Sequence, residues 1–237
     1  MCDGRGLSMH AASENFLTGK KVLITAGPTQ ETIDPVRYLS NHSSGKTGYA
    51  LARCAAKAGA SVYLVSGPVC LDVPEDMQVI SVKSAREMLE ACEKLFDHVD
   101  IAIFTAAVCD YRAKEVANHK IKKNPDVEGA DCNNATMRLE LIENPDIIAT
   151  LAARKKSQIV VGFAAETENL IENAMDKLQR KNADFIVANL VGEGRLGFGT
   201  DTNEVYIVDK KGINALGVMH KDEIALRILQ RCVACDI

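Results

Sequence analysis

Short apolar runs that alternate with helical segments constrain the fold more than any other feature of this sequence. The runs fall at 21–28, 61–68, 100–108, 158–165 and 184–191. Strands of a parallel sheet are covered on both faces by crossover helices, so they read as continuous apolar runs. The pattern therefore predicts an α/β fold built on a mainly parallel sheet with helices on both faces.

Helix and turn signals separate these runs. Helical patterns cover 45–58, 84–96, 144–156, 167–181 and 220–232. Ser84 and Glu87 form a capping-box pattern, and Asn144 with Pro145 predicts a cap and first helical position. The stretch 203–218 predicts a hairpin that turns at "DKKG". The expected architecture is Rossmann-like and doubly wound with a C-terminal hairpin region, and its ligands should lie beyond the carboxyl ends of the strands.

Charge and composition exclude several functional classes. The formal net charge of −4 provides no general basic field for nucleic acid or an anionic membrane. No apolar run approaches the ~20 residues that a membrane span requires. Residues 1–18 lack the apolar core of a secretory signal, so we interpret them as a leader or linker that precedes one domain over 19–237.

Cysteine usage indicates a reducing compartment. The eight cysteines lie mostly among apolar neighbours and lack the paired spacing of a zinc or disulfide framework. A single C-x-x-C, at 232–235, does not change this interpretation. We expect reduced thiols and a cytoplasmic protein.

The stretch "SNHSSGKTG" at 40–48 contains Gly-Lys-Thr but is not a P-loop. A Walker A motif requires glycine where this chain has Ser40. A G-x-G-x-x-G occurs at 192–197, but no helix pattern follows it, as dinucleotide binding would require. The turn after the first strand also lacks the dinucleotide glycines. A nicotinamide-dependent enzyme is therefore the less favoured alternative.

Polar groups near the expected strand ends can bind an anion. The "NHSSG" segment offers amide, hydroxyl and backbone donors where a helix begins, although Ser43 or Ser44 could simply cap that helix. Asp110 follows the strand 100–108, where a ligand crevice is expected, although it could equally be a loop cap or a surface ion pair.

Two lysine clusters lie on different segments. Lys120 and Lys122 share one side of an extended stretch, and Lys177 and Lys181 share a helix face at a spacing where like charges repel. Each cluster alone is typical of a solvated surface, but together they indicate a polyphosphate site. The polar loop 124–136 has the length and composition of a lid.

These residues also carry a family resemblance. In order, the chain contains "ITAGPTQETIDPVRYLSNHSSGKTGYALA", "TAAVCDYR", "KIKK", "NPDII", "VVGFAAET", "KLQRKNADFIVAN" and "FGTDTNEV". The set resembles the phosphopantothenoylcysteine synthetases of the bacterial, CTP-dependent type. The resemblance runs from about residue 20 to the C-terminal helix.

The resemblance implies a ligase of coenzyme A biosynthesis. Such an enzyme joins 4′-phosphopantothenate and L-cysteine to give 4′-phosphopantothenoyl-L-cysteine through an acyl-cytidylate, and it releases CMP and pyrophosphate. It implies CTP as co-substrate, Mg²⁺, and a homodimer to which the hairpin region 203–218 contributes. In many bacteria this domain follows a flavin-dependent decarboxylase domain, so no flavin is expected in this chain.

The resemblance also implies roles for particular residues. Catalytic roles fall on Asn41 and Lys120. Nucleotide contacts fall on Phe104, Thr105, Ala106, Asp110, Lys120, Pro145, Asp146, Ile147, Ile148, Phe163, Lys177 and Lys181. Contacts with phosphopantothenate and the intermediate fall on Arg37, Asn41, Ser43, Ser44, Gly45 and Ala107. Mg²⁺ is expected mainly through the CTP phosphates, with Asp110 as a candidate ligand, and the loop 124–136 corresponds to a flap that excludes water.

Two positions depart from the family pattern. Cys109 stands where alanine or serine is usual, and we interpret it as apolar filler rather than a nucleophile. His42 replaces a common arginine. A non-catalytic nucleotide-binding module remains an alternative, but it would need neither Asn41 nor Lys120.

Overall fold

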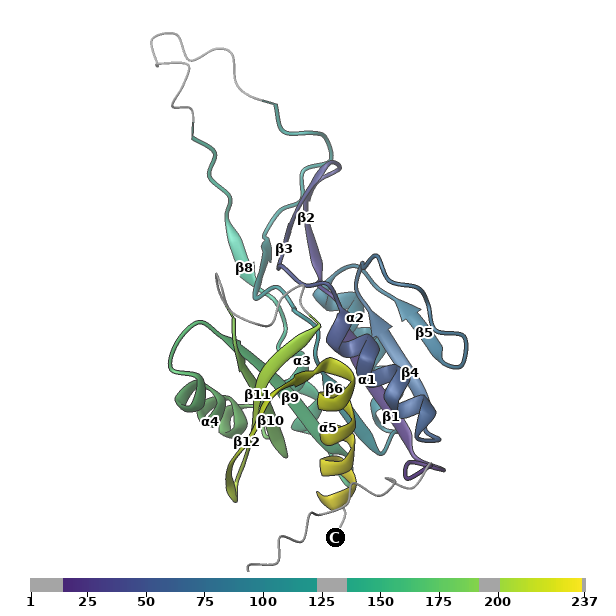
Figure 1. Cartoon of the computed structure of the whole chain (residues 1–237). Helices are drawn as coiled ribbons and strands as arrows, with labels where there is room; N and C mark the ends of the chain where they lie inside the picture. The colour runs from purple at the N-terminus through teal and green to yellow at the C-terminus, as the bar shows by residue number, and fades with distance from the viewer. Residues whose placement is uncertain (1–14, 123–135, 192–200, 236–237) are drawn as a thin grey trace, which may run out of the picture.

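An eight-stranded sheet forms the centre of the parts of the chain that the computed structural model describes, residues 15–122, 136–191 and 201–235 (Figure 1). Its strand order is β12-β11-β10-β9-β6-β1-β4-β5. The strands are β1 (Lys21–Ala26), β4 (Ser61–Ser66), β5 (Gln78–Ser81), β6 (Ile101–Phe104), β9 (Ile159–Glu166), β10 (Phe185–Leu190), β11 (Thr202–Asp209) and β12 (Gly212–His220). All five predicted apolar strands are present in this sheet, which confirms the predicted fold class.

The strand order of the sheet reverses beside β1. It runs outward from β1 to β4 and β5, then returns to β6 on the other side of β1 and continues to β9 and β10. These strands pair in parallel, with Val22 of β1 aligned between Val62 of β4 and Ile101 of β6. Open α/β sheets bind ligands where the strand order reverses, beyond the carboxyl ends of the strands.

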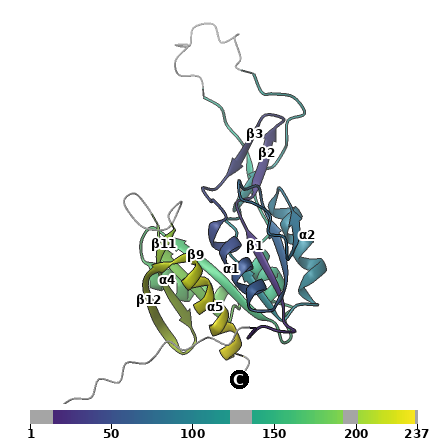
Figure 2. The same ribbon diagram turned by 45° about the vertical axis from the view of Figure 1, so that its right-hand side comes forward.

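Helices cover both faces of the sheet (Figures 1 and 2). The helices are α1 (Lys46–Lys57), α2 (Ala85–Phe96), α3 (Ile147–Ala152), α4 (Leu170–Arg180) and α5 (Lys221–Cys235). Side chains of α1 and α5 join one buried cluster, and side chains of α2, α3 and α4 join the other. Alternate residues of β1 enter opposite clusters, Val22 and Ile24 on one face and Leu23 on the other, as the two-residue period of a strand requires.

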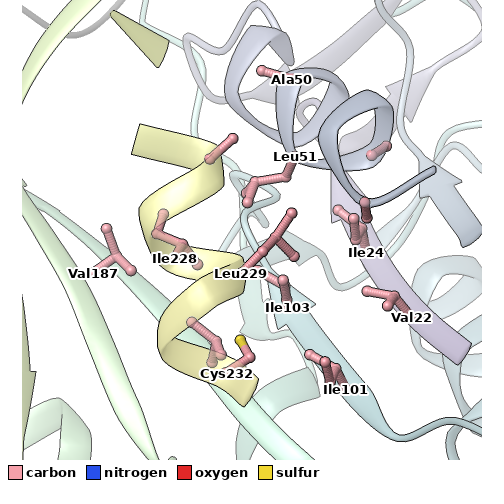
Figure 3. Packing of buried hydrophobic residues seen from close by; sticks show 14 of the residues in the cluster. Val22, Ile24, Ala50, Leu51, Ile101, Ile103, Val187, Ile228, Leu229 and Cys232 are labelled. Carbon is pink, nitrogen blue, oxygen red and sulfur yellow. The ribbon is translucent and has the colours of Figure 1, made fainter. Parts of the chain in front are cut away.

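The seam between α1 and α5 is the part of the core that Figure 3 shows. Leu229 of α5 points towards Leu51 of α1 and Ile103 of β6, whereas Ile228 lies on the side of Val187 of β10, and both α5 residues are fully buried. This packing places the closing helix over the centre of the parallel sheet, although the C-terminal hairpin extends the sheet at its edge.

All five predicted helices and the late hairpin are present, but the predicted cap at Asn144 is wrong. The capping box of Ser84 and Glu87 forms as expected. Asn144 does not cap α3; the cap is Asp146, whose Oδ1 accepts from the Ala149 amide at 3.0 Å. Neither Ser43 nor Ser44 caps α1, because the N-cap residue is Gly45, in the left-handed region at φ 74°.

Five short strands were not predicted from the sequence pattern. These are β5 of the main sheet and two antiparallel pairs, β2 (Gln30–Asp34) with β3 (Arg37–Ser40) and β7 (Tyr111–Ala113) with β8 (Leu141–Glu143). They are three to five residues long and contain at most two consecutive apolar residues, so they lack the apolar runs that mark buried strands. The two pairs project beyond the carboxyl ends of the sheet strands (Figures 1 and 2).

The core takes in part of the segment that we interpreted as a leader. Leu17 is fully buried, and its amide donates to the carbonyl of Ala58 at 2.8 Å. The lid proposed over 124–136, apart from Thr136, and the glycine motif at 192–197 lie outside the described residues. Among the described residues, none of the helices is both long and apolar enough to cross a membrane.

The α1–α5 seam generates a test of the core. We expect Leu229→Ala to lower the free energy of unfolding by about 2–5 kcal/mol, because truncation leaves a cavity in a fully buried contact. Chemical denaturation of the purified chain measures this loss. Arg227→Ala on the exposed side of the same helix is the control, and it should change the free energy by about 0.5 kcal/mol or less. An equal effect of the two substitutions would contradict the packing.

Candidate functional site

Two cavities open at the carboxyl ends of β1, β6 and β9, where the strand order reverses. The first has a volume of about 470 Å³ and the second about 490 Å³. Both lie where the doubly wound fold predicts ligand binding. Each is large enough for a small-molecule ligand.

The first cavity gathers most of the residues that the sequence assigned to a nucleotide. Its lining includes Phe104, Ala106, Asp110, Pro145, Asp146, Ile147, Ile148, Phe163, Lys177 and Lys181. These residues come from β6, the start of α3, β9 and α4, segments that are far apart in the sequence. The parallel sheet brings them together because their strands end at one edge.

The second cavity gathers most of the residues assigned to the other substrate. Its lining includes Asn41, Ser43, Ser44, Gly45, Thr105 and Ala107. Thr105, assigned by resemblance to the nucleotide, therefore lies on this side of the site and not in the first cavity. Its hydroxyl donates to the carbonyl of Thr25 at 2.7 Å, so it also ties β6 to β1.

The two cavities share one wall. Ala106, Val108, Asp110, Phe163 and Lys177 line both of them. A ligand in one cavity therefore lies next to a ligand in the other, with a carboxylate and an ammonium group at the boundary. Such an arrangement can bring two anionic ligands into contact and offset part of their repulsion.

Lys177 is held at this boundary by its own helix and the neighbouring strand. Its Nζ donates to the carbonyl of Phe163 at 2.5 Å. Burial lowers the pKa of Lys177, and the positive charge of Lys181 adds to this effect, whereas Glu166 opposes it. A bound anion would relieve both the desolvation and the lysine–lysine repulsion.

Lys181 forms an ion pair across the mouth of the first cavity. Its Nζ donates to Asp146 Oδ2, while Asp146 Oδ1 caps α3. Burial raises the pKa of Asp146, but the hydrogen bonds from Lys181 and the Ala149 amide outweigh it and leave the pKa lowered. Asp146 thus remains ionised, and its ion pair with Lys181 links the start of α3 to the end of α4 at the edge of the cavity.

Close backbone packing fixes the "SNHSSGKTG" segment against the sheet. A Cβ on Gly48 would lie 2.6 Å from both the Ala26 Cβ and the Thr105 Oγ1, so only glycine lets α1 approach the strands this closely. Asn41 is oriented by its amide, which donates to the carbonyl of Val108 at 3.0 Å. Its Oδ1 is the part of the amide that this hydrogen bond does not use.

Arg37 and Lys120 do not line either cavity. Arg37 donates to the buried Asp34 through Nε at 3.0 Å and to the carbonyl of Ile121 at 2.8 Å. Asp34 Oδ2 also accepts from the Ile121 amide at 3.1 Å. The hairpin β2–β3 therefore holds the segment that carries Lys120, and the hydrogen bond from Arg37 keeps the pKa of Asp34 well below its usual range.

The sequence analysis missed several residues that line the cavities. Tyr111, Glu143 and Asn144 contribute to the first, and Lys46, Asn189, Asn203 and Lys221 contribute to the second. Lys46, Asn189 and Asn203 belong to stretches quoted for the resemblance, although no role was assigned to them, whereas Lys221 on α5 lies outside those stretches. Only the sheet topology, which places β11 beside β10, brings Asn203 and Lys221 to the site.

Cys109 matches the interpretation as filler. Its side chain is buried against Thr29, and burial raises the pKa of its thiol, the reverse of what activates a nucleophile. Cys54, Cys70, Cys92 and Cys109 form no disulfide with one another. These thiols agree with the prediction of reduced cysteines.

The described residues fit a metal that arrives with a phosphate ligand better than a resident metal centre. Within the described ranges, no three His, Cys, Asp or Glu side chains cluster closely enough to hold an ion. Three carboxylates line the first cavity: Asp146, which is paired with Lys181, and the single side chains of Asp110 and Glu143. Mg²⁺ commonly binds through one or two carboxylates together with substrate phosphates, so these two residues are the candidates to hold it.

The fold and the paired cavities define an α/β protein with two adjoining cavities at a topological switch point, the place where proteins of this class bind ligands. A family profile described as "DNA/pantothenate metabolism flavoprotein C-terminal domain" matches residues 17–235. The chain belongs to this family.

Similar proteins agree with the family assignment. The coenzyme A biosynthesis bifunctional protein CoaBC of Bacillus subtilis (strain 168) is 48% identical over 95% of this chain and 54% of its own length. The protein of the same name from Vibrio cholerae is 45% identical over 94% of this chain and 56% of its own length. The chain thus spans about half the length of these curated relatives.

Solved structures share the fold. The crystal structure of the C-terminal domain of a CoaBC protein is 43% identical, with a TM-score of 0.75, and the match covers 92% of this chain and 95% of that one. A flavoprotein of DNA/pantothenate metabolism from Streptococcus pneumoniae has the same TM-score of 0.75 at 22% identity, and it supports the fold alone. The nicotinamide-enzyme alternative has no counterpart among the relatives named here.

The Asp34 cluster generates a test by pH. Because the pKa of Asp34 is lowered in the folded chain, its stabilising effect is present above its unfolded pKa, near 3.8, and is lost as pH falls through the folded value. We expect the difference in unfolding free energy between the wild type and Asp34→Asn to be largest at neutral pH and to shrink in acid.

Denaturation at a series of pH values measures this difference. Asp72→Asn, in an exposed position of the loop after β4, is the matched control and should leave the profile of the wild type unchanged. A difference for Asp34→Asn that stays constant down to about pH 2 would contradict an ionised, hydrogen-bonded Asp34.

Proposed function

We propose that this chain is a CTP-dependent phosphopantothenate–cysteine ligase of coenzyme A biosynthesis. It joins 4′-phosphopantothenate and L-cysteine, and it releases CMP and pyrophosphate. One observation carries the proposal: two cavities that share a wall with Asp110 and Lys177. The names of relatives that the chain matches over nearly its whole length support the same pathway.

Two adjoining cavities suit a reaction that activates a carboxylate. In the first step, a carboxylate oxygen of phosphopantothenate attacks the α-phosphorus of CTP. The bond to the β-phosphate breaks, pyrophosphate leaves and an acyl-cytidylate forms. Two anions must approach each other, so positive charge at their meeting point lowers the barrier. Lys177 lies at that point because it lines both cavities.

The first cavity is the proposed nucleotide site. The turn over Pro145, Asp146, Ile147 and Ile148 offers backbone groups to the base, and Phe163 forms a wall. Lys177 and Lys181 hold phosphates, and Lys181 can exchange its partner Asp146 for a phosphate oxygen. Mg²⁺ would neutralise further charge when it is bound with CTP. CTP in preference to ATP is part of the proposal.

The second cavity is the proposed site for phosphopantothenate and the acyl-cytidylate. In the second step, the amine of L-cysteine attacks the acyl carbon, the C–N bond forms, CMP leaves and the amine loses a proton. Asn41 lies beside Val108 on the shared wall, where its amide can orient the anhydride. We assign Ser43, Ser44, Gly45 and Ala107 to binding of the same ligand.

We place Lys120 and Arg37 in a part of the site that either moves when ligands bind or is completed by a second copy of the chain. Neither lines a cavity within the single chain. Their connection through Asp34 and Ile121 couples the two residues to one hairpin. A homodimer remains part of the proposal, with the edge strand β12 as one candidate surface because Ile213 and Val218 on it are more than half exposed.

The direct test is pyrophosphate release with 4′-phosphopantothenate, magnesium and either CTP or ATP, with and without L-cysteine. We expect turnover that prefers CTP and is stimulated by cysteine. Turnover with ATP alone would retain the ligase chemistry but reject the nucleotide assignment. No turnover by folded protein with either nucleotide would reject the proposed function.

Lys177→Ala should raise the KM for CTP about 10-fold or more, because a charge-assisted hydrogen bond to a phosphate is lost. Steady-state kinetics with varied CTP measures the change. Lys94→Ala removes an exposed lysine from α2 and is the matched control. A KM for CTP equal to that of the control variant would reduce Lys177 to a structural residue.

Asn41→Asp should form the acyl-cytidylate but convert it slowly, with a loss of ~10²–10³ in the rate of the second step, since one oriented donor is removed. Quenched-flow analysis of nucleotide products separates the two steps. Asn214→Asp, at an exposed position of β12, controls for the added charge. Unchanged turnover in Asn41→Asp would remove Asn41 from the mechanism.

A further inference from the structure

Asn144 lines the first cavity and directly precedes the turn over 145–148, whose backbone we assigned to the nucleotide base. The residue does not cap α3, because Asp146 provides that cap. Its side chain forms hydrogen bonds instead with the segment that follows β6, and that segment forms another wall of the same cavity. Asn144 therefore joins two walls of the proposed nucleotide site.

Three hydrogen bonds fix Asn144 between these walls. Its backbone amide donates to the carbonyl of Asp110 at 2.7 Å, and its Nδ2 donates to the carbonyl of Cys109 at 2.9 Å. Its Oδ1 accepts from Arg112 Nη1 at 3.1 Å. Arg112 Nη1 also donates to the carbonyl of Glu143, so one guanidinium group holds the end of β8 and the side chain that follows it. Both polar atoms of the Asn144 side chain are thus engaged with the protein.

The contact with Cys109 connects the turn to the main sheet. Cys109 is buried, and its own amide donates to the Thr29 hydroxyl at 2.9 Å. Thr29 follows β1 and is fully buried. The side chain of Asn144 therefore binds to backbone that the central strands already hold in place.

The strand that leads into the turn gives it little support. β8 has three residues and pairs with β7 in a sheet of two strands, apart from the main sheet (Figure 1). Such a small sheet is marginally stable by itself. Pro145 has no N–H, so the backbone cannot donate a hydrogen bond at the first position of the turn. Asn144 thus fixes the start of the turn, and the buried side chain of Ile147 fixes its end.

We propose that Asn144, held by Arg112, is a positioning residue that determines which nucleotide base the first cavity selects. It acts through the turn over 145–148 and not by contact with the base, because its polar atoms already bind the protein. CTP and UTP differ at one exocyclic group, an amino group in CTP and a carbonyl oxygen in UTP. Backbone groups distinguish the two only when they are well aligned, since hydrogen bonds weaken steeply with poor geometry. The inference rests on the proposed function and deepens it.

Asn144→Ala tests the proposal in steady-state assays that vary each substrate in turn. We expect the KM for CTP to rise about 10-fold, since two hydrogen bonds that hold the turn are lost. The KM values for 4′-phosphopantothenate and cysteine should stay unchanged. Arg112→Ala is the second variant and should act in the same direction, which keeps the test valid if Asn144→Ala fails to fold. An equal rise of all three KM values in both variants would overturn the proposal, because it would indicate a general loss of structure.

Gln158→Ala is the matched control. Gln158 is a buried amide that donates to the carbonyl of Phe96 at 3.3 Å and accepts from the amide of Lys156 at 2.7 Å. It directly precedes β9, at the end of the strand opposite the cavities. Its removal should lower the midpoint of chemical denaturation but leave the KM for CTP unchanged. A rise of this KM equal to that in Asn144→Ala would overturn the proposal.

Equilibrium binding separates this inference from the ligase assignment. Calorimetric titration with CTP or UTP, in the presence of magnesium, requires no turnover, so it decides the role of Asn144 even if the chain does not release pyrophosphate. Wild-type protein should bind CTP more tightly than UTP, and Asn144→Ala and Arg112→Ala should lose most of this preference. Equal affinity of the wild type for the two nucleotides, or a preference that both variants retain, would overturn the proposal.

Discussion

The pairing of β1 with β6 positions the rest of the site. The pairing continues past the strand ends, where the Ala107 amide donates to the Gly27 carbonyl at 2.9 Å and the Cys109 amide donates to the Thr29 hydroxyl at 2.9 Å. This extension places the carbonyl of Val108 where Asn41 reaches it, and it sets Asp110 on the wall between the cavities. The switch point of the sheet is thus a fixed frame, and the polar side chains depend on it.

The sheet also determines where positive charge is concentrated. The chain is acidic overall, with a formal net charge of −4, yet lysines from α1, α4 and α5 converge on cavities that β1, β6 and β9 create. Burial and mutual repulsion lower the pKa values of Lys177 and Lys221, so both lysines are more favourable beside an anion than alone. An enzyme that brings a carboxylate to a triphosphate needs this concentration of positive charge, and a sheet edge supplies it from distant parts of the chain.

The sequence predicts the buried frame better than the projecting parts. Continuous apolar runs and caps such as Ser84–Glu87 predict the strands and α2, because burial leaves a periodic pattern. The hairpin β2–β3 left no such pattern, since its stability comes from Asp34, whose partner Ile121 is 87 positions away. For the same reason Lys221 was missed, whereas Lys177 and Lys181 were found by their spacing on one helix. The N-cap of α1 is Gly45 and not Ser43 or Ser44, the capping alternative that the sequence left open, because the backbone adopts a left-handed conformation there, which residue type alone does not reveal.

The central claim is that the two cavities suffice to form an acyl-cytidylate before cysteine takes part. Exchange of label between radioactive pyrophosphate and CTP tests it most directly, with magnesium and 4′-phosphopantothenate present and cysteine absent. The account predicts exchange that requires 4′-phosphopantothenate and does not require cysteine, because the first step is reversible at the shared wall. Exchange that occurs only when cysteine is present, in protein that forms the complete product, would contradict a separate first step.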